Sequence, residues 1–83
     1  MTAAPWDYEA VSGTKVRLTN RTGAKAAMVS LREHESNKVV HSVSPVEPDA
    51  SFEFKTSGGL VLHVEWRSIH PEGDHEAMWT FKT

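Results

Sequence analysis

The 83-residue sequence contains no cysteine. This absence excludes a disulfide framework, thiolate metal ligands and a cysteine nucleophile. A domain of this length hides only about 60 to 65% of the surface that its unfolded chain exposes, so it has little interior in which to build a deep catalytic cleft. Its stability must come from tight apolar packing or from association with other proteins.

The chain also lacks a long hydrophobic run and a block of like charge. No segment approaches the roughly 20 apolar residues that cross a bilayer. The first segment, MTAAPWDYEAVSGT, has neither the basic nor the apolar region of a signal peptide. Nine Lys and Arg stand among eleven Asp and Glu, giving a net charge of -2. We therefore expect a soluble protein without a signal peptide, intracellular or virion-associated, that binds neither nucleic acid nor membrane.

Alternation of apolar and polar residues dominates the chain from Lys15 onward. It is found in four segments: KVRLTN, SFEFKT, LVLHVEWRSI and EAMWTFK. Such alternation indicates half-buried strands, and turn residues separate the segments about every ten residues. We predict an all-β fold, a small antiparallel β-sandwich of about six to seven strands. Residues 15–83 form its single domain, and residues 1–14 precede it as an N-terminal arm or an edge strand.

Two hairpins follow if each loop keeps the apolar faces together. A three-residue SGG loop pairs Phe54 with Leu62. A four-residue PEGD loop places Trp66 opposite Trp79 and makes an aromatic cross-strand pair.

The segment Gly23–Lys38 is ambiguous. As a helix it gathers alanines, Met28 and Leu31 on one stripe, which would make the fold α+β. As a strand it buries Ala27, Val29 and Leu31, and HESN turns the chain back. We favour the strand because the helix has no capping residues at its start.

The spacing of KVRLTNRTGAKAAMVSL, PDASFEF and GLVLHVEW resembles that of immunoglobulin-like and prealbumin-like β-sandwich domains. The resemblance covers about Lys15 to Lys82 and implies a two-sheet sandwich. It assigns no functional residue, and the chain lacks the cysteine pair of true immunoglobulin domains.

The segment SIHPEGDHEAMW contains the candidate metal ligands. In the predicted hairpin His70 and His75 flank the loop on one face, with Cβ atoms about 5 Å apart. Two imidazoles could bind zinc or nickel, with Asp74 or Glu72 as a third ligand. Pro-Glu-Gly-Asp is also the composition of an ordinary turn, which is the interpretation we favour. We therefore predict no metal and no other cofactor.

Aromatic residues provide the partner-binding candidates. Trp66 and Trp79 belong to the predicted core faces. Trp6 and Tyr8 lie ahead of the main alternation, where they could cover a sheet edge or anchor in another protein. The sequence shows no nucleophile elbow, phosphate loop or carboxylate pair, so we predict that the protein is not an enzyme.

These expectations lead to a functional hypothesis. The protein is a non-enzymatic interaction module that docks onto a larger assembly, as a homo-oligomer or as a multi-copy accessory subunit such as a capsid-decorating virion protein. The alternative is a small ligand-binding module that takes carbohydrate on exposed aromatics or a metal on His70 and His75.

Overall fold

The computed structural model describes residues 4–83, and these residues contain seven strands and no helix. No segment of this part of the chain is therefore a helix that could cross a membrane. The strands are β1 (Trp6–Ser12), β2 (Lys15–Asn20), β3 (Lys25–Glu33), β4 (Val39–Val43), β5 (Ser51–Lys55), β6 (Val61–Ile69) and β7 (His75–Lys82).

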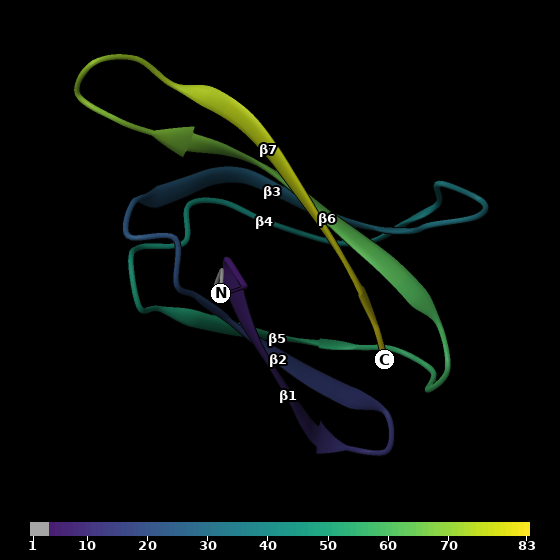
Figure 1. Ribbon diagram of the computed structural model, residues 1–83. Coiled ribbons are helices and arrows are strands. Elements are labelled where there is room, and N and C mark those ends of the chain that lie inside the picture. The colour runs from purple at the N-terminus through teal and green to yellow at the C-terminus, as the bar shows by residue number, and fades with distance from the viewer. Residues whose placement is uncertain (1–3) are drawn as a thin grey trace.

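The strands form two antiparallel sheets, one with the order β1-β2-β5 and one with the order β4-β3-β6-β7. Figure 1 shows the two sheets as layers, with the β6–β7 hairpin extending beyond the other strands at the upper left. The fold class is the predicted small all-β sandwich. The segment Trp6–Ser12 is an edge strand of the three-stranded sheet, which is one of the two alternatives for the N-terminal segment.

The predicted hairpin across SGG is wrong, because β5 and β6 belong to different sheets. Phe54 pairs with Val16 of β2, and Leu62 pairs with Phe81 of β7. Both side chains are buried, so they meet in the core from opposite layers instead of side by side on one sheet. Alternation fixes which side chains face inward, but it does not say which strand lies next to which.

The β6–β7 hairpin forms, with a register two residues away from the prediction. Trp66 lies opposite Ala77, and Val64 lies opposite Trp79. The loop is longer than PEGD because the ladder ends at Ser68 and His75. A shift of two residues keeps every side chain on its predicted face.

The segment Gly23–Lys38 forms strand β3 and a turn, as favoured, and the helical alternative is wrong. The inward residues are Ala26, Val29 and Leu31, so the prediction for Ala27 is wrong. The reason is a β-bulge: β3 pairs Ala27 with Arg67 and Ser30 with Glu65, which leaves two residues opposite Trp66. The extra residue reverses the alternation within one strand.

The core lies between the sheets and takes the inward residues of six strands together with a residue of the β4–β5 connection. Its buried apolar members are Trp6, Val16, Leu18, Ala26, Val29, Leu31, Val46, Phe54, Leu62, Val64, Trp66 and Phe81. Burial of such side chains stabilises the fold by about 1.5 to 3 kcal/mol for each large one.

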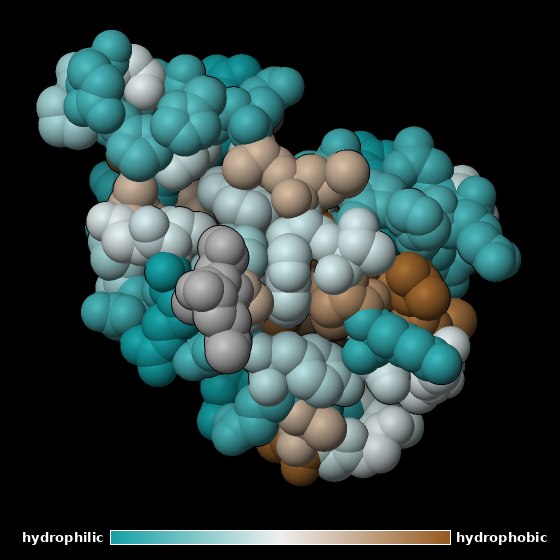
Figure 2. Space-filling view, viewed as in Figure 1, coloured by the Kyte–Doolittle hydropathy of each residue, from teal (hydrophilic) through white to brown (hydrophobic). Residues whose placement is uncertain are grey.

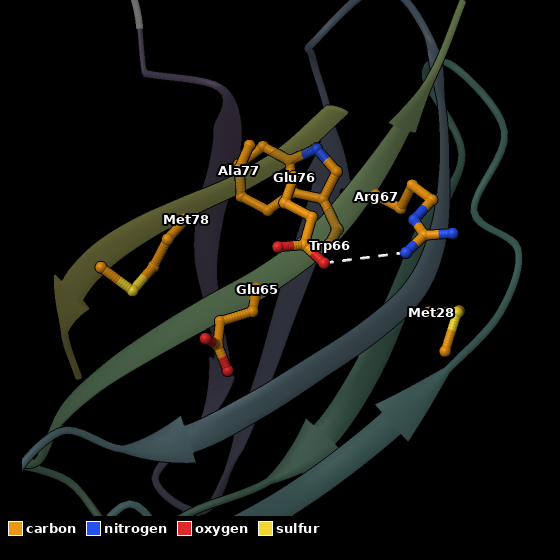
Figure 3. Close-up of a pocket in the computed structure, with 7 residues that line it drawn as sticks. All are labelled: Met28, Glu65, Trp66, Arg67, Glu76, Ala77 and Met78. Carbon is orange, nitrogen blue, oxygen red and sulfur yellow. Dashed lines mark ion pairs between the residues drawn. The ribbon is translucent and has the colours of Figure 1, made fainter. Parts of the chain in front are cut away.

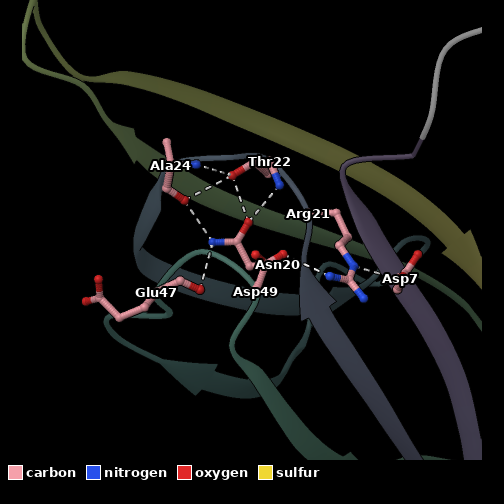
Figure 4. A network of polar contacts seen from close by, with 7 residues as sticks. All are labelled: Asp7, Asn20, Arg21, Thr22, Ala24, Glu47 and Asp49. Carbon is pink, nitrogen blue, oxygen red and sulfur yellow. Dashed lines mark hydrogen bonds and ion pairs between the residues drawn. The ribbon is translucent and has the colours of Figure 1, made fainter.

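A buried asparagine joins two of the connections that cross between the sheets, β2 to β3 and β4 to β5. Asn20 is fully buried, and its amide Nδ2 donates to the carbonyl oxygens of Ala24 and Val46 at 2.9 and 3.0 Å. Its Oδ1 accepts from the backbone N–H and the hydroxyl of Thr22 at 2.9 and 2.7 Å. Figure 4 shows the contacts of Asn20 with Thr22 and Ala24 beside the ion pairs of Arg21 with Asp7 and Asp49, each at 2.8 Å. Asn20 therefore stabilises the connection between β2 and β3.

Candidate functional site

Met28 is held in an unusual conformation at the β3 bulge. Its backbone φ is 52°, in the left-handed region that few residues other than glycine, asparagine and aspartate adopt. Its backbone N–H donates to the Ser44 hydroxyl at 2.8 Å, which fixes the bulge. The side chain is 68% exposed although methionine is apolar. The backbone is thus strained, at about 1 to 2 kcal/mol, to display an apolar side chain to solvent.

A hollow of about 400 Å³ lies beside Met28, on β3, β6 and β7. Figure 3 shows Met28 and Met78 on opposite sides of it. Met78 is 59% exposed and pairs with Glu65 across the strands. The lining residues are Met28, Glu65, Trp66, Arg67, Glu76, Ala77 and Met78. We call Met28, Met78 and the hollow between them the methionine patch.

The charged residues at the methionine patch neutralise one another. Arg67 Nη2 lies 3.7 Å from Glu76 Oε1. Arg32 Nε lies 3.0 Å from Glu65 Oε2, an ion pair without the geometry of a hydrogen bond. The patch therefore offers two flexible apolar side chains in a setting without a large excess of either charge.

The two histidines of the β6–β7 hairpin come together as predicted, although the register differs. The rings of His70 and His75 are stacked, with centroids 4.5 Å apart and planes 10° from parallel. Parallel rings direct their in-plane lone pairs side by side instead of toward one point. Asp74 Oδ1 accepts from the backbone N–H of His70 at 3.3 Å, as a turn residue does. Among residues 4–83, no three His, Asp or Glu side chains are placed to hold one metal ion.

The tip of this hairpin has a polar surface. Figure 2 shows the projecting lobe at the upper left as almost entirely hydrophilic. Ser68 Oγ lies 2.8 Å from His70 Nε2, and Ser68 is buried. The Asp74 carboxylate contacts the main chain of His70 and not its ring, so the three residues do not have the geometry of a catalytic triad.

His63 is a polar residue that is more buried than its position in the alternating pattern predicts. Its parity predicts a half-exposed side chain, but it is only 7% exposed on the outer face of its sheet. The ring of His34 lies against it edge to face, with centroids 5.7 Å apart. Within residues 4–83 its Nδ1 has no hydrogen-bond partner. Neighbouring side chains of the outer face, which no local pattern predicts, cover the ring.

The two predicted partner-binding aromatics have different environments. Trp6 is 1% exposed and packs edge to face on Phe52 and Trp66, at 5.9 and 5.5 Å between ring centroids. It is a core residue, so it cannot anchor in another protein while the sandwich is folded. Tyr8 is 38% exposed, and its ring lies 5.7 Å from that of Phe81 on β7. Tyr8 thus remains accessible at one side of the sandwich.

A charged ladder crosses the outer face of the three-stranded sheet. Arg17 of β2 contacts Glu53 of β5 at 2.7 Å and Glu9 of β1 at 2.8 Å. The hydrogen bond from Arg17 is the main cause that lowers the pKa of Glu53, and the hydrogen bond to Glu53 is the main cause that raises the pKa of Arg17. This face is therefore a solvated, ion-paired surface.

Sequence reasoning missed the methionine patch. The favoured strand, with Ala27 and Val29 inward, already directs Met28 outward, but nothing in the sequence marks the bulge or the left-handed backbone of Met28. Met78 could have been found, because its neighbours Ala77 and Trp79 are assigned to the core face and Met78 must then face solvent.

Comparisons of the chain with protein-family models, curated proteins and solved structures give no significant match.

Proposed function

We propose that the protein is a non-enzymatic docking module that binds another protein through the methionine patch. The observation that supports this most strongly is the strained, exposed conformation of Met28. A strained residue persists where the surrounding structure enforces it, and such residues cluster at binding sites. A bulge that displays an apolar side chain contributes nothing to burial in the isolated chain, so a contact outside the chain is the simplest role for it.

The patch matches a partner of defined chemistry. Methionine side chains are flexible and polarisable, and they are enriched at protein-binding surfaces. The ion pairs Arg32–Glu65 and Arg67–Glu76 leave no uncompensated charge between the methionines. The matching partner is therefore a protein segment that inserts an uncharged apolar side chain into the hollow, and not a strongly charged peptide.

We further infer that the sandwich is of the immunoglobulin-like type. Three connections cross between the sheets, β2 to β3, β4 to β5 and β5 to β6, as in Greek-key sandwiches. In its concrete form the proposal makes the protein a multi-copy accessory subunit of a large assembly, such as a capsid-decorating virion protein. The native complex then has a mass far above that of one 9.2 kDa chain.

The substitution Met28→Asn tests the docking role. Asparagine adopts positive φ more readily than methionine, so the variant should gain about 0.5 to 1 kcal/mol of unfolding free energy. It should also lose partner binding by at least about tenfold, because the apolar side chain is gone. Urea denaturation gives the first quantity, and quantitative recovery of the partner with the tagged protein gives the second.

A matched control distinguishes loss of the methionine patch from the loss of any exposed apolar side chain. Val39→Asn removes another exposed apolar side chain, from β4, away from the hollow. It should leave partner recovery unchanged. Retained binding by Met28→Asn, or equal loss in both variants, would contradict the proposal.

A further inference from the structure

The two sheets end in four edge strands, and β7 differs from the other three. It has eight residues, no proline and no irregularity in its register with β6. In contrast, β1 contains a bulge, β4 and β5 have five residues each, and the pairing of β4 is irregular. Short strands and bulges protect sheet edges from pairing with other chains. β7 lacks these protections, and its charged side chains are confined to Glu76 and Lys82, near its two ends.

The hydrogen-bonding pattern of β7 with β6 shows which backbone N–H and C=O groups of β7 are free to pair with another strand. Thr83 N–H donates to the Leu60 carbonyl at 2.8 Å, so residues 60 and 83 form a hydrogen-bonded pair. Such pairs alternate along an antiparallel ladder. The odd-numbered residues of β7 therefore bond to β6, whereas four even-numbered residues direct N–H and C=O away from it: Glu76, Met78, Thr80 and Lys82.

These groups define a self-complementary register. Two copies of β7 related by a two-fold axis at Trp79 pair Glu76 with Lys82 and Met78 with Thr80. The two-fold axis repeats each of these pairs, so there are four, and each joins backbone groups that point away from β6. Two hydrogen bonds for each pair give about eight between the chains. A shift of one residue would place free backbone N–H and C=O groups of one copy opposite residues of the other copy that already bond to β6. The pairing must therefore match even-numbered residues with even-numbered residues.

Charge supports the same register. Glu76 Oε1 lies 3.7 Å from Arg67 Nη2 of its own chain, but the Glu76 side chain is 84% exposed and so can also contact a second copy. Lys82 has no ion-pair partner within residues 4–83. In the two-fold arrangement each Glu76 faces Lys82 of the other copy, so the dimer contains two such pairs. Opposite charges directly across a strand pair are favourable, and like charges are not.

We infer that a second copy of this chain adds to the β7 edge, so that two four-stranded sheets become one continuous antiparallel sheet. Tyr8, which packs on Phe81 beside this edge, lies near the new contact. The β7 edge adjoins the methionine patch, since Glu76 and Met78 also line its hollow. The inference concerns the backbone groups of this strand and goes beyond the proposed function.

Sedimentation equilibrium over a wide concentration range tests this pairing. The wild-type protein should form a reversible dimer. Glu76→Lys and Lys82→Glu should each raise its dissociation constant by at least about tenfold, because two attractive pairs become repulsive. The double variant should restore dimerisation to near the wild-type level. Lys55→Glu, the same charge change on the edge strand β5, should have little effect.

Amide hydrogen exchange provides a second readout that identifies the strand. The amides of Glu76, Met78, Thr80 and Lys82 should exchange fast in the monomer and slowly in the dimer. Amides of odd-numbered β7 residues should be protected in both. A monomer at every concentration, or a dimer in which the even-numbered amides still exchange fast, would overturn the inference. Met28→Asn should dimerise as wild type does, so failure of the docking proposal and failure of this pairing give different results.

Discussion

Single residues with unusual environments determine how this small sandwich is held together. Asn20 is the clearest case, because its amide bonds to backbone groups of the β2–β3 and β4–β5 connections. Alanine at this position would remove the partner of the Thr22 N–H, whereas the Val46 and Ala24 carbonyls would keep the Ala26 N–H and the Thr22 hydroxyl as donors. We predict that Asn20→Ala lowers the unfolding free energy by about 2 kcal/mol, measured by urea denaturation, since one unsatisfied buried group costs about 1 to 3 kcal/mol. A loss below about 1 kcal/mol would show that water replaces the amide.

At the residue scale, the sequence predicted inward positions where strands are regular and failed where they are not. Val64 and Trp66 are buried as their alternation requires. Ala27 was misplaced because one extra residue in β3 reverses the pattern, so that Ala26 is buried in its place, and bulges have no local sequence marker here. His63 was misplaced because its burial depends on neighbouring side chains of the outer face.

At the scale of elements, ion pairs link the strands of the three-stranded sheet. Glu53 of β5 accepts hydrogen bonds from Arg17 of β2, and this contact lowers its pKa. A carboxyl group with a lowered pKa stabilises the fold above its unfolded pKa, and that contribution is lost as the pH falls through the folded pKa. Stability should therefore decrease in acid partly through Glu53.

We predict that Glu53→Gln is less stable than wild type at neutral pH, and that this difference disappears as the pH falls through the lowered pKa of Glu53. Urea denaturation across the acid range measures the difference. Glu72→Gln is the control, because Glu72 lies in the exposed β6–β7 turn and has no ion pair within residues 4–83. A difference that persists in acid would mean that Glu53 acts through packing instead of charge.

The sequence predicted most of the strands, but not how they pair. The connection through SGG is short enough for a hairpin, yet it crosses from β5 to β6 in the other sheet. Turn composition constrains the local direction of the chain, whereas the choice of neighbour depends on how both faces are covered. The β6–β7 hairpin was predictable because both of its strands are long and strongly alternating.

At the scale of the molecule, Trp6 joins the two sheets. Its indole packs on Phe52 of its own sheet and on Trp66 of the opposite sheet. We predict that Trp6→Ala lowers the unfolding free energy by about 3 to 5 kcal/mol, and that Trp6→Phe lowers it less. Circular dichroism during denaturation measures both. A fold that tolerates alanine here would reassign Trp6 to the partner-anchor role that its burial argues against.

The central claim is that Met28 and Met78 contact another protein. The sequence contains only three methionines, so photoactivatable methionine labels the methionine patch with little background. The measurement is crosslinking of the labelled protein in its native cellular material, with the crosslinked peptides identified by mass spectrometry. The account predicts that one and the same protein, other than a second copy of this chain, is crosslinked through both Met28 and Met78. Crosslinks to unrelated proteins at the two positions, or none at either position in an intact complex, would contradict it.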